Sequence, residues 1–145
     1  MRLIETEIKI KASPETVWSV LTKLDKYVEW NPFINNAKGE VRVGQKLEVC
    51  ISPPNGKQMI FKQSVKTVVE NSDFSWLGRF LLPGIFDGRH IFKITPTENG
   101  CLLVQKEEFS GLLVPFLWGS LDQHTRAGFE LMNSALKQKA ESKNT

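Results

Sequence analysis

Cysteine is scarce in this sequence, and the spacing that would make it structural or metal-binding is missing. Only Cys50 and Cys101 occur, and neither lies in a CxxC or histidine-rich segment. Disulfide frameworks and zinc sites need clustered ligands, so neither is indicated. A reactive thiolate would need a basic neighbour, which the sequence does not convincingly supply. We therefore expect both cysteines to be small buried apolar side chains.

Charge of one sign and long hydrophobic runs are also lacking. The 19 basic and 16 acidic residues are interspersed and leave a formal net charge of +3. This pattern does not indicate a nucleic-acid partner. No apolar run has the length of a membrane span, and Glu5 interrupts the N-terminus before a signal-peptide core could form. We therefore expect a soluble cytoplasmic protein without stable membrane insertion.

Nucleotide-binding, serine-activating and metal-binding motifs are missing as well. The sequence has no P-loop, no GxGxxG, no GxSxG, and no His/Cys/Asp cluster at metal-ligand spacing. It therefore implies no cofactor and no metal.

What is present is the composition of one globular domain. The 145 residues are 41% hydrophobic and 24% charged, which suits a single domain over residues 1–145 with an ordinary core. The polar end of the chain, from about residue 138 to 145, is expected to fray.

The first third of the chain predicts one strand and then helix. Apolar and charged residues alternate over residues 3–11, as in a half-buried strand. Ser13 and Pro14 are preferred residues at a helix start, and apolar residues then recur at helical spacing. Because Pro32 restricts the residue before it to extended geometry, one or two short helices should fill residues 14–30.

The middle of the chain predicts antiparallel strands and the end predicts one long helix. Short alternating runs are separated by turn-forming Gly, Pro, Asn and Asp clusters. The predicted strands are residues 34–42, 46–53, 57–70, 73–82, 85–95 and 101–110. From Pro115 to Glu141 apolar residues step by three or four, as in a helix. Gly119 and Gly128 each cost this helix about 1 kcal/mol, which close packing or room for a ligand would offset.

This order of elements predicts an α+β fold. Strands followed by a terminal helix, without βαβ alternation, favour an antiparallel sheet. We expect a curved seven-stranded antiparallel sheet around a long C-terminal helix, with the short helices after the first strand.

The pattern of tryptophans, glycines and polar residues resembles a known superfamily along nearly the whole chain. The residues that carry the resemblance are Trp30-Asn31-Pro32-Phe33-Ile34, Gly39, Gly44, Trp76, Gly78, Gly84, Gly88, His90-Ile91-Phe92, Gln105, Glu107, Phe109-Ser110-Gly111, Gly128-Phe129 and Met132-Asn133. They are similar to the START-like (SRPBCC) helix-grip superfamily, and most to its polyketide cyclase/dehydrase-like branch. The resemblance implies a helix-grip fold but not one activity. Gln63, Arg89 and Cys101 depart from the branch, which commonly has a proline, an acidic residue and a hydroxyl residue there.

His90 and Glu107 are the candidate catalytic pair. The residues beside them alternate so that both should face inward, and a four-residue hairpin at Thr97–Gly100 would pair them directly. A carboxylate beside a buried histidine can serve as an acid/base pair. Alternatively, the two groups satisfy each other at a cavity wall.

The candidate ligand-binding residues are mostly aromatic side chains of the strands and apolar-face residues of the terminal helix. They are Trp30, Phe61, Trp76, Phe92, Gln105, Phe109, Trp118, Leu121, His124, Gly128 and Met132. Such residues suit a hydrophobic guest with few polar anchors, and core packing is the alternative for each. Trp30 and Trp118 lie beside helix ends and are expected near a cavity mouth.

An apolar turn, residues 80–86, has several possible roles. It could gate a cavity, dock a partner, or lie buried against Leu112, Leu113 and Phe116.

The sequence thus supports more than one class of function. The first is binding of a hydrophobic, lipid-like or polyketide-like small molecule as a carrier or sequestering protein. The second is a cofactor-independent cyclase, aromatase or dehydratase that uses His90 and Glu107. The third is a protein or membrane-surface interaction module with a filled interior. The sequence does not indicate an oligomeric state.

Overall fold

A curved sheet and a long helix make up most of the chain in the computed structural model, which describes residues 1–54, 56–80 and 82–143, with Phe80 described by its backbone alone. The strands are β1 (Arg2–Ile10), β2 (Ile34–Lys38), β3 (Lys46–Ile51), β4 (Met59–Val69), β5 (Asp73–Phe80), β6 (Phe86–Thr97) and β7 (Gly100–Ser110). The helices are α1 (Pro14–Thr22), the short 3-10 helix η1 (Leu24–Lys26), α2 (Tyr27–Trp30) and α3 (Val114–Ser142).

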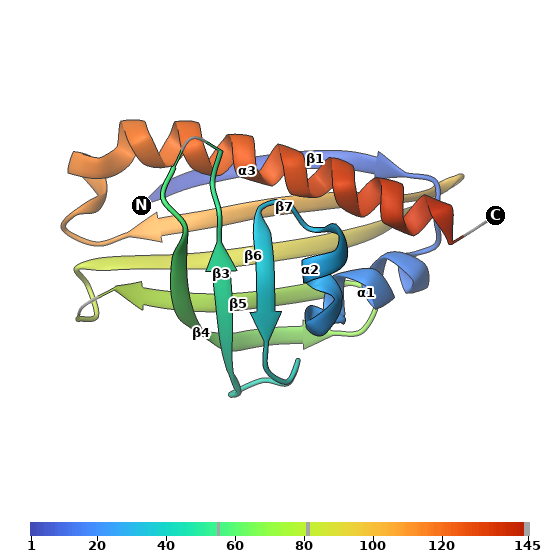
Figure 1. Cartoon of the computed structure of the whole chain (residues 1–145), viewed down its shortest axis with the longest axis horizontal. Helices are drawn as coiled ribbons and strands as arrows, with labels where there is room; N and C mark the ends of the chain where they lie inside the picture. Colours follow the sequence, from blue (N-terminus) through green and yellow to red (C-terminus); the bar gives the residue numbers. More distant parts are fainter. Residues whose placement is uncertain (55, 81, 144–145) are drawn as a thin grey trace.

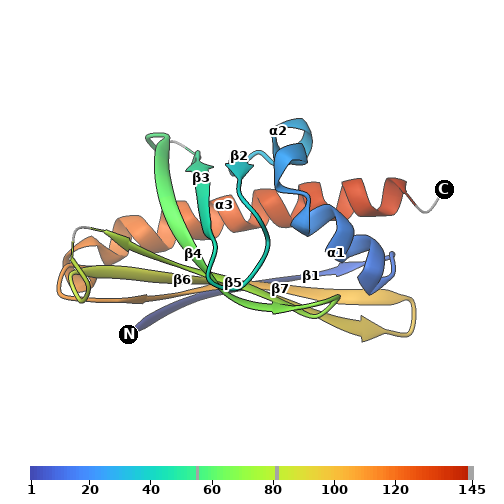
Figure 2. The ribbon, with the colours of Figure 1, turned by 90° about the horizontal axis from the view of Figure 1, so that it is seen from below.

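The strands form one antiparallel sheet in the order β1-β7-β6-β5-β4-β3-β2 (Figure 1). Figure 2 shows α3 along one side of the sheet, with α1, α2 and the upper ends of β2 to β4 on that same side. The predicted α+β helix-grip architecture is therefore confirmed.

The helical segment after β1 begins and ends as its sequence predicts. The Ser13 side chain accepts a hydrogen bond from the Thr16 amide, which caps α1. At the other end, Asn31 Oδ1 accepts hydrogen bonds from the amides of Phe33 and Ile34, at 3.0 and 2.9 Å. This turn leads directly into β2 and holds Phe33 in the interior, where it is buried.

Strand pairing agrees with the predicted register where the site lies. β6 and β7 pair from Thr97 opposite Gly100 to Asp87 opposite Ser110, so His90 stands directly opposite Glu107. The main boundary difference is β2, which ends at Lys38 and not near residue 42. Gly39 follows with a φ of 130°, a conformation that favours glycine and turns the chain out of the strand.

Helix α3 matches the predicted range to within one residue at each end, and its C-terminal end is held in place. It continues to Ser142, Ala140 is fully buried, and the Lys11 amide donates a hydrogen bond to Glu141 at 2.8 Å. Fraying was expected from about residue 138 to 145; the helix is instead ordered to Ser142, and residues 144 and 145 lie outside the described residues. Near its middle, a Cβ on Gly128 would overlap the ring of Phe33, so close packing explains this glycine.

The two cysteines and the hydrophobicity of the helices agree with the composition of the sequence. Cys50 and Cys101 are both buried free thiols, as predicted. Within residues 1–54, 56–80 and 82–143, no helix combines the length and apolarity needed to cross a bilayer.

Candidate functional site

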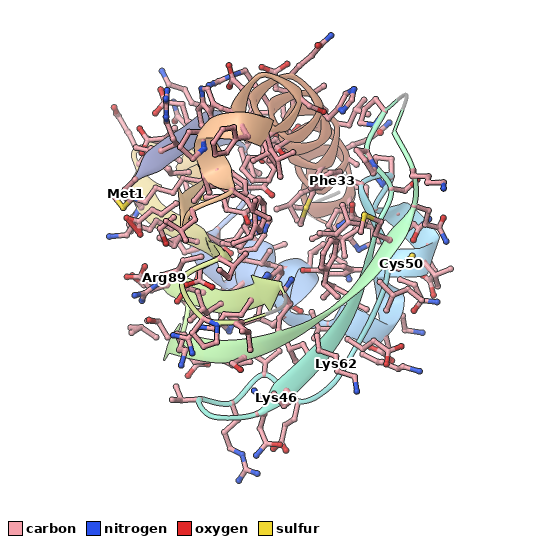
Figure 3. All side chains as sticks on the ribbon, turned by 90° about the vertical axis from the view of Figure 1, so that its left-hand side faces the viewer. Met1, Phe33, Lys46, Cys50, Lys62 and Arg89 are labelled. Atoms are coloured by element: carbon pink, nitrogen blue, oxygen red, sulfur yellow. The ribbon has the colours of Figure 1, made fainter. Side chains whose placement is uncertain are left out.

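A cavity of about 390 Å³ lies between the sheet and the N-terminal half of α3. Its lining residues come from three regions: the β3–β4 hairpin, the middle of the sheet, and α3. They are Phe33, Ile51, Pro53, Gly56, Lys57, Met59, Phe61, Gln63, Gly78, Arg79, Phe86, Gly88, Glu107, Phe109, Ser120, Leu121, His124 and Thr125. Figure 3 views the molecule from the end where α3 begins, with Phe33 between α3 and the β3–β4 side.

The floor of the cavity is a row of directly paired residues across four strands. Gln63 of β4 pairs with Gly78 of β5, Gly78 pairs with Gly88 of β6, and Gly88 pairs with Phe109 of β7. The two central glycines have no side chains, which makes room above them for side chains from the flanking strands. A Cβ on Gly78 would overlap Gln63 Oε1, and one on Gly88 would overlap Glu107 Oε2. The polar ends of Gln63 and Glu107 therefore lie over this pair of glycines.

Glu107 is the carboxyl group inside the cavity. Its side chain is 18% exposed, and burial raises its pKa to about 8. The cause is desolvation, which disfavours the charged form of a carboxyl group. At neutral pH Glu107 is therefore mostly protonated and can donate a hydrogen bond.

His90 lies beside Glu107 on the neighbouring strand, enclosed by aromatic rings. Its ring centroid is 4.6 Å from Phe92, 4.8 Å from Phe129 and 4.9 Å from Trp76, and its side chain is 2% exposed. Burial lowers the pKa of His90 to about 4, although its hydrogen bond with Gln105 acts in the opposite direction. The ring is therefore neutral at neutral pH.

A buried hydrogen-bond chain determines which nitrogen of His90 carries the proton. Gln105 Nε2 donates to Asn133 Oδ1 at 2.6 Å, so Gln105 Oε1 is an acceptor, 2.8 Å from His90 Nε2. His90 Nε2 must then be the donor. Asn133 continues the chain by donating to Thr6 Oγ1 at 2.9 Å, and Thr6 donates to the Gln105 carbonyl. This chain ties α3 to β1 and β7.

The other nitrogen of His90 faces Glu107 without a hydrogen bond. The distance from His90 Nδ1 to Glu107 Oε1 is 3.8 Å, beyond hydrogen-bond range. Neutral His90 carries its proton on Nε2, so Nδ1 has none, and the proton of the carboxyl group stays on Glu107. The predicted proximity of the pair is confirmed, but only Glu107 reaches the cavity.

Several predicted ligand-binding residues line the cavity and others do not. Phe61 and Phe109 lie on the sheet side, and Leu121 and His124 lie on α3. The Nδ1 atom of His124 lies 3.3 Å from the Oγ atom of Ser120, one turn earlier in α3.

The structure places the other predicted residues outside the cavity wall. Trp76, Phe92, Gln105 and Met132 are buried in the core or its hydrogen-bond chain, where they fill the sheet–helix interface. The space beside Gly128 is filled by the ring of Phe33, so no ligand can lie there.

The two tryptophans expected near a cavity mouth also pack elsewhere. Trp30 packs edge-on against Tyr27 with a centroid distance of 5.1 Å. Trp118 lies under the guanidinium group of Arg2, 5.3 Å away, and edge-on to Phe109. Neither lines the cavity.

The apolar turn at residues 80–86 lies beside the start of α3. Leu112 and Leu113 donate backbone hydrogen bonds to the carbonyls of Gly84 and Ile85. However, Leu82, Leu112 and Phe116 are exposed, Phe116 by 84%, so of the three possible roles of this turn the structure does not support burial. Leu81 lies outside the described residues.

Several cavity residues are absent from the predicted set, among them Phe33, Ile51 and Met59, and Gln63 is the buried polar one. It is 7% exposed and its Oε1 has no hydrogen-bond partner among the described residues. The signal was available, since Gln63 alternates with Phe61 and Val65 on the inward face of a strand.

Two other hollows are larger in volume but differently lined. One, of about 470 Å³, lies between α1, η1 and the sheet, and its lining includes Asp25, Lys38 and Glu70. The other, of about 450 Å³, lies over β2 to β4 and its lining includes Lys38 and Glu48. Charged side chains form a larger share of these two linings than of the cavity beneath α3, which also includes Lys57 and Arg79, so both are less suited to an apolar guest. The cavity beneath α3 is therefore the candidate site.

One known protein family matches nearly the whole chain. A family model described as polyketide cyclase / dehydrase and lipid transport matches residues 1–141. None of the curated proteins matches the chain at a significant level.

Solved structures show the same fold at low sequence identity. The Zhui aromatase/cyclase from Streptomyces sp. R1128 has a TM-score of 0.82 and 14% identity, covering 99% of this chain and 96% of its own. A START superfamily protein from Mycobacterium smegmatis has a TM-score of 0.77 and 20% identity, covering 97% of both chains. Protein MLL2253 from Mesorhizobium loti has a TM-score of 0.71 and 21% identity, covering 94% of this chain and 98% of its own. The chain belongs to the polyketide cyclase / dehydrase and lipid transport family.

Proposed function

We propose that this chain binds a hydrophobic small molecule in the cavity beneath α3, as a carrier or sequestering protein. The observation that carries the proposal is the cavity of about 390 Å³, whose walls are mainly apolar side chains such as Phe61, Phe109 and Leu121. Small-molecule sites commonly have volumes of about 300–1,000 Å³ and few polar groups. The family's description, which includes lipid transport, agrees with a hydrophobic ligand.

The enzymatic alternative has weaker support from the geometry. A cyclase, aromatase or dehydratase that used His90 and Glu107 would need both groups within reach of the guest. His90 is enclosed by aromatic rings, and its Nε2 is engaged with Gln105. Of the pair, only Glu107 could meet a guest. A protonated carboxyl group can donate a proton to the substrate but cannot accept one from it.

The interaction-module alternative predicted a filled interior. The cavity does not fit that expectation.

A matched pair of substitutions on α3 tests the proposal. Leu121 lines the cavity, whereas Leu131 is 46% exposed and is absent from the lining. The larger side chain in Leu121→Trp should fill the space, while Leu131→Trp adds the same group at the surface. Titration with the uncharged fluorescent dye Nile red should show saturable binding to wild type and Leu131→Trp, and at least a tenfold loss in Leu121→Trp.

Two results would contradict the proposal. One is the absence of saturable dye binding to the wild type. The other is equal affinity in both variants, with circular dichroism confirming that each is folded.

A further inference from the structure

The amide oxygen of Gln63 is a buried polar atom without a partner. The side chain is 7% exposed, and Oε1 has no hydrogen-bond partner among the residues that the structure describes. Buried polar side chains nearly always have a hydrogen-bond partner, so each exception needs a reason. Gln63 lines the cavity, and a molecule bound there could supply the missing partner.

A second polar group approaches the same floor from the opposite side. Gln63 reaches over Gly78 from β4, and Glu107 reaches over Gly88 from β7. The two glycines are directly paired, and neighbouring strands are about 5 Å apart. An amide and a carboxyl group therefore lie side by side over two adjacent strand positions that have no side chains of their own.

We propose that Gln63 and Glu107 together bind an uncharged oxygen group of the guest, a hydroxyl or a carbonyl, above the Gly78–Gly88 floor. This inference rests on the proposed function and names the chemistry of its ligand. The cavity then selects apolar molecules that carry such an oxygen and disfavours plain hydrocarbons.

The hydrogen-bonding capacities of the two side chains match this group. A protonated carboxyl donates one hydrogen bond, while an amide can both donate and accept. A hydroxyl can accept from Glu107 and donate to Gln63, and a carbonyl can accept from both. A carboxylate guest is disfavoured, because the same lack of water that keeps Glu107 protonated would penalise a second buried anion.

The test compares three guests that share one ring system: naphthalene, 2-naphthol and 2-naphthoate. Their affinities can be measured by displacement of Nile red. Wild type should bind 2-naphthol at least tenfold more tightly than naphthalene, and should bind 2-naphthoate most weakly.

Two variants remove the polar groups one at a time. In Gln63→Leu and in Glu107→Leu the preference for 2-naphthol should fall below threefold, with naphthalene affinity changed by less than threefold. Gln58→Leu is the control, because Gln58 belongs to the hollow over β2 to β4 and is absent from the cavity lining. It should keep the wild-type preference.

The outcomes separate this inference from the function on which it rests. Binding of naphthalene without a preference for 2-naphthol overturns the inference and leaves the proposed function standing. A preference that survives both leucine variants also overturns it. Failure to bind any of the three guests overturns the proposed function and this inference together. Gln63→Leu removes an unpartnered buried amide and should fold at least as well as wild type, so loss of the preference cannot be attributed to unfolding.

Discussion

Replacing Glu107 by glutamine should change how stability depends on pH. In the folded protein Glu107 holds its proton until its pKa of about 8, whereas an exposed glutamate has a pKa of 4.5. Between these values the folded state binds more protons than the unfolded state, so the free energy of unfolding falls as pH rises. Glutamine keeps the shape of the side chain and cannot ionise, so this loss should disappear in Glu107→Gln.

His90 acts in the opposite direction over a lower range. Its pKa is lowered from 6.5 to about 4, so below pH 6.5 the unfolded state takes up the proton first. Stability therefore falls as pH falls from 6.5 towards 4. Between pH 4.5 and 6.5 the two contributions largely cancel, and between 6.5 and 8 only the Glu107 contribution acts.

The size of the expected change in the free energy of unfolding follows from the window between pH 6.5 and pH 8. One pKa unit corresponds to about 1.4 kcal/mol, so a window of about 1.5 pH units gives about 2 kcal/mol. Urea unfolding followed by tryptophan fluorescence at pH 6.5 and pH 8 measures it. Wild type should lose about 2 kcal/mol between these values relative to Glu107→Gln.

The control is Glu108→Gln, which removes a carboxyl group from the next position of β7, on the opposite face of the sheet. It should lose stability between pH 6.5 and 8 as wild type does. If Glu107→Gln also lost the same stability as wild type, the reasoning that burial keeps this carboxyl protonated would be refuted.

Three further predictions concern stability and can be checked by chemical denaturation. Asn133→Ala leaves buried partners unsatisfied and should cost about 1–3 kcal/mol, whereas exposed Ser134→Ala should change little. Gly128→Ala should destabilise the protein by about 1–3 kcal/mol, because the added methyl group overlaps Phe33. Gly119→Ala should instead stabilise α3 by up to about 1 kcal/mol, because its methyl group meets open space. Gln63→Leu should raise stability by about 1 kcal/mol; equal or lower stability would mean that its amide is satisfied in the free protein.

The fold was largely predictable because its local signals agree with one another. Alternation identified the strands, Ser13 and Pro14 marked the start of α1, and the hairpin placed His90 opposite Glu107. The C-terminal end of α3 was not predictable in the same way. Its order depends on the burial of Ala140 and on the contact of Glu141 with Lys11, which are long-range interactions that a polar local sequence does not reveal.

The candidate site was only partly predictable for a related reason. Alternation shows that Trp76 and Phe92 face inward, but it does not show whether a residue meets a cavity or the core. That distinction depends on position along the sheet, because the cavity lies over Gly78 and Gly88 and ends before the aromatic cluster around His90.

The most direct test of the cavity as the ligand site is a crystal structure of the protein soaked with 6-bromo-2-naphthol, in which anomalous scattering locates the bromine. The account predicts one bromine peak between Phe61 and Leu121, with the hydroxyl group directed to Gln63 and Glu107. A peak confined to the hollow beside Trp18, or to the hollow over β2 to β4, would contradict it.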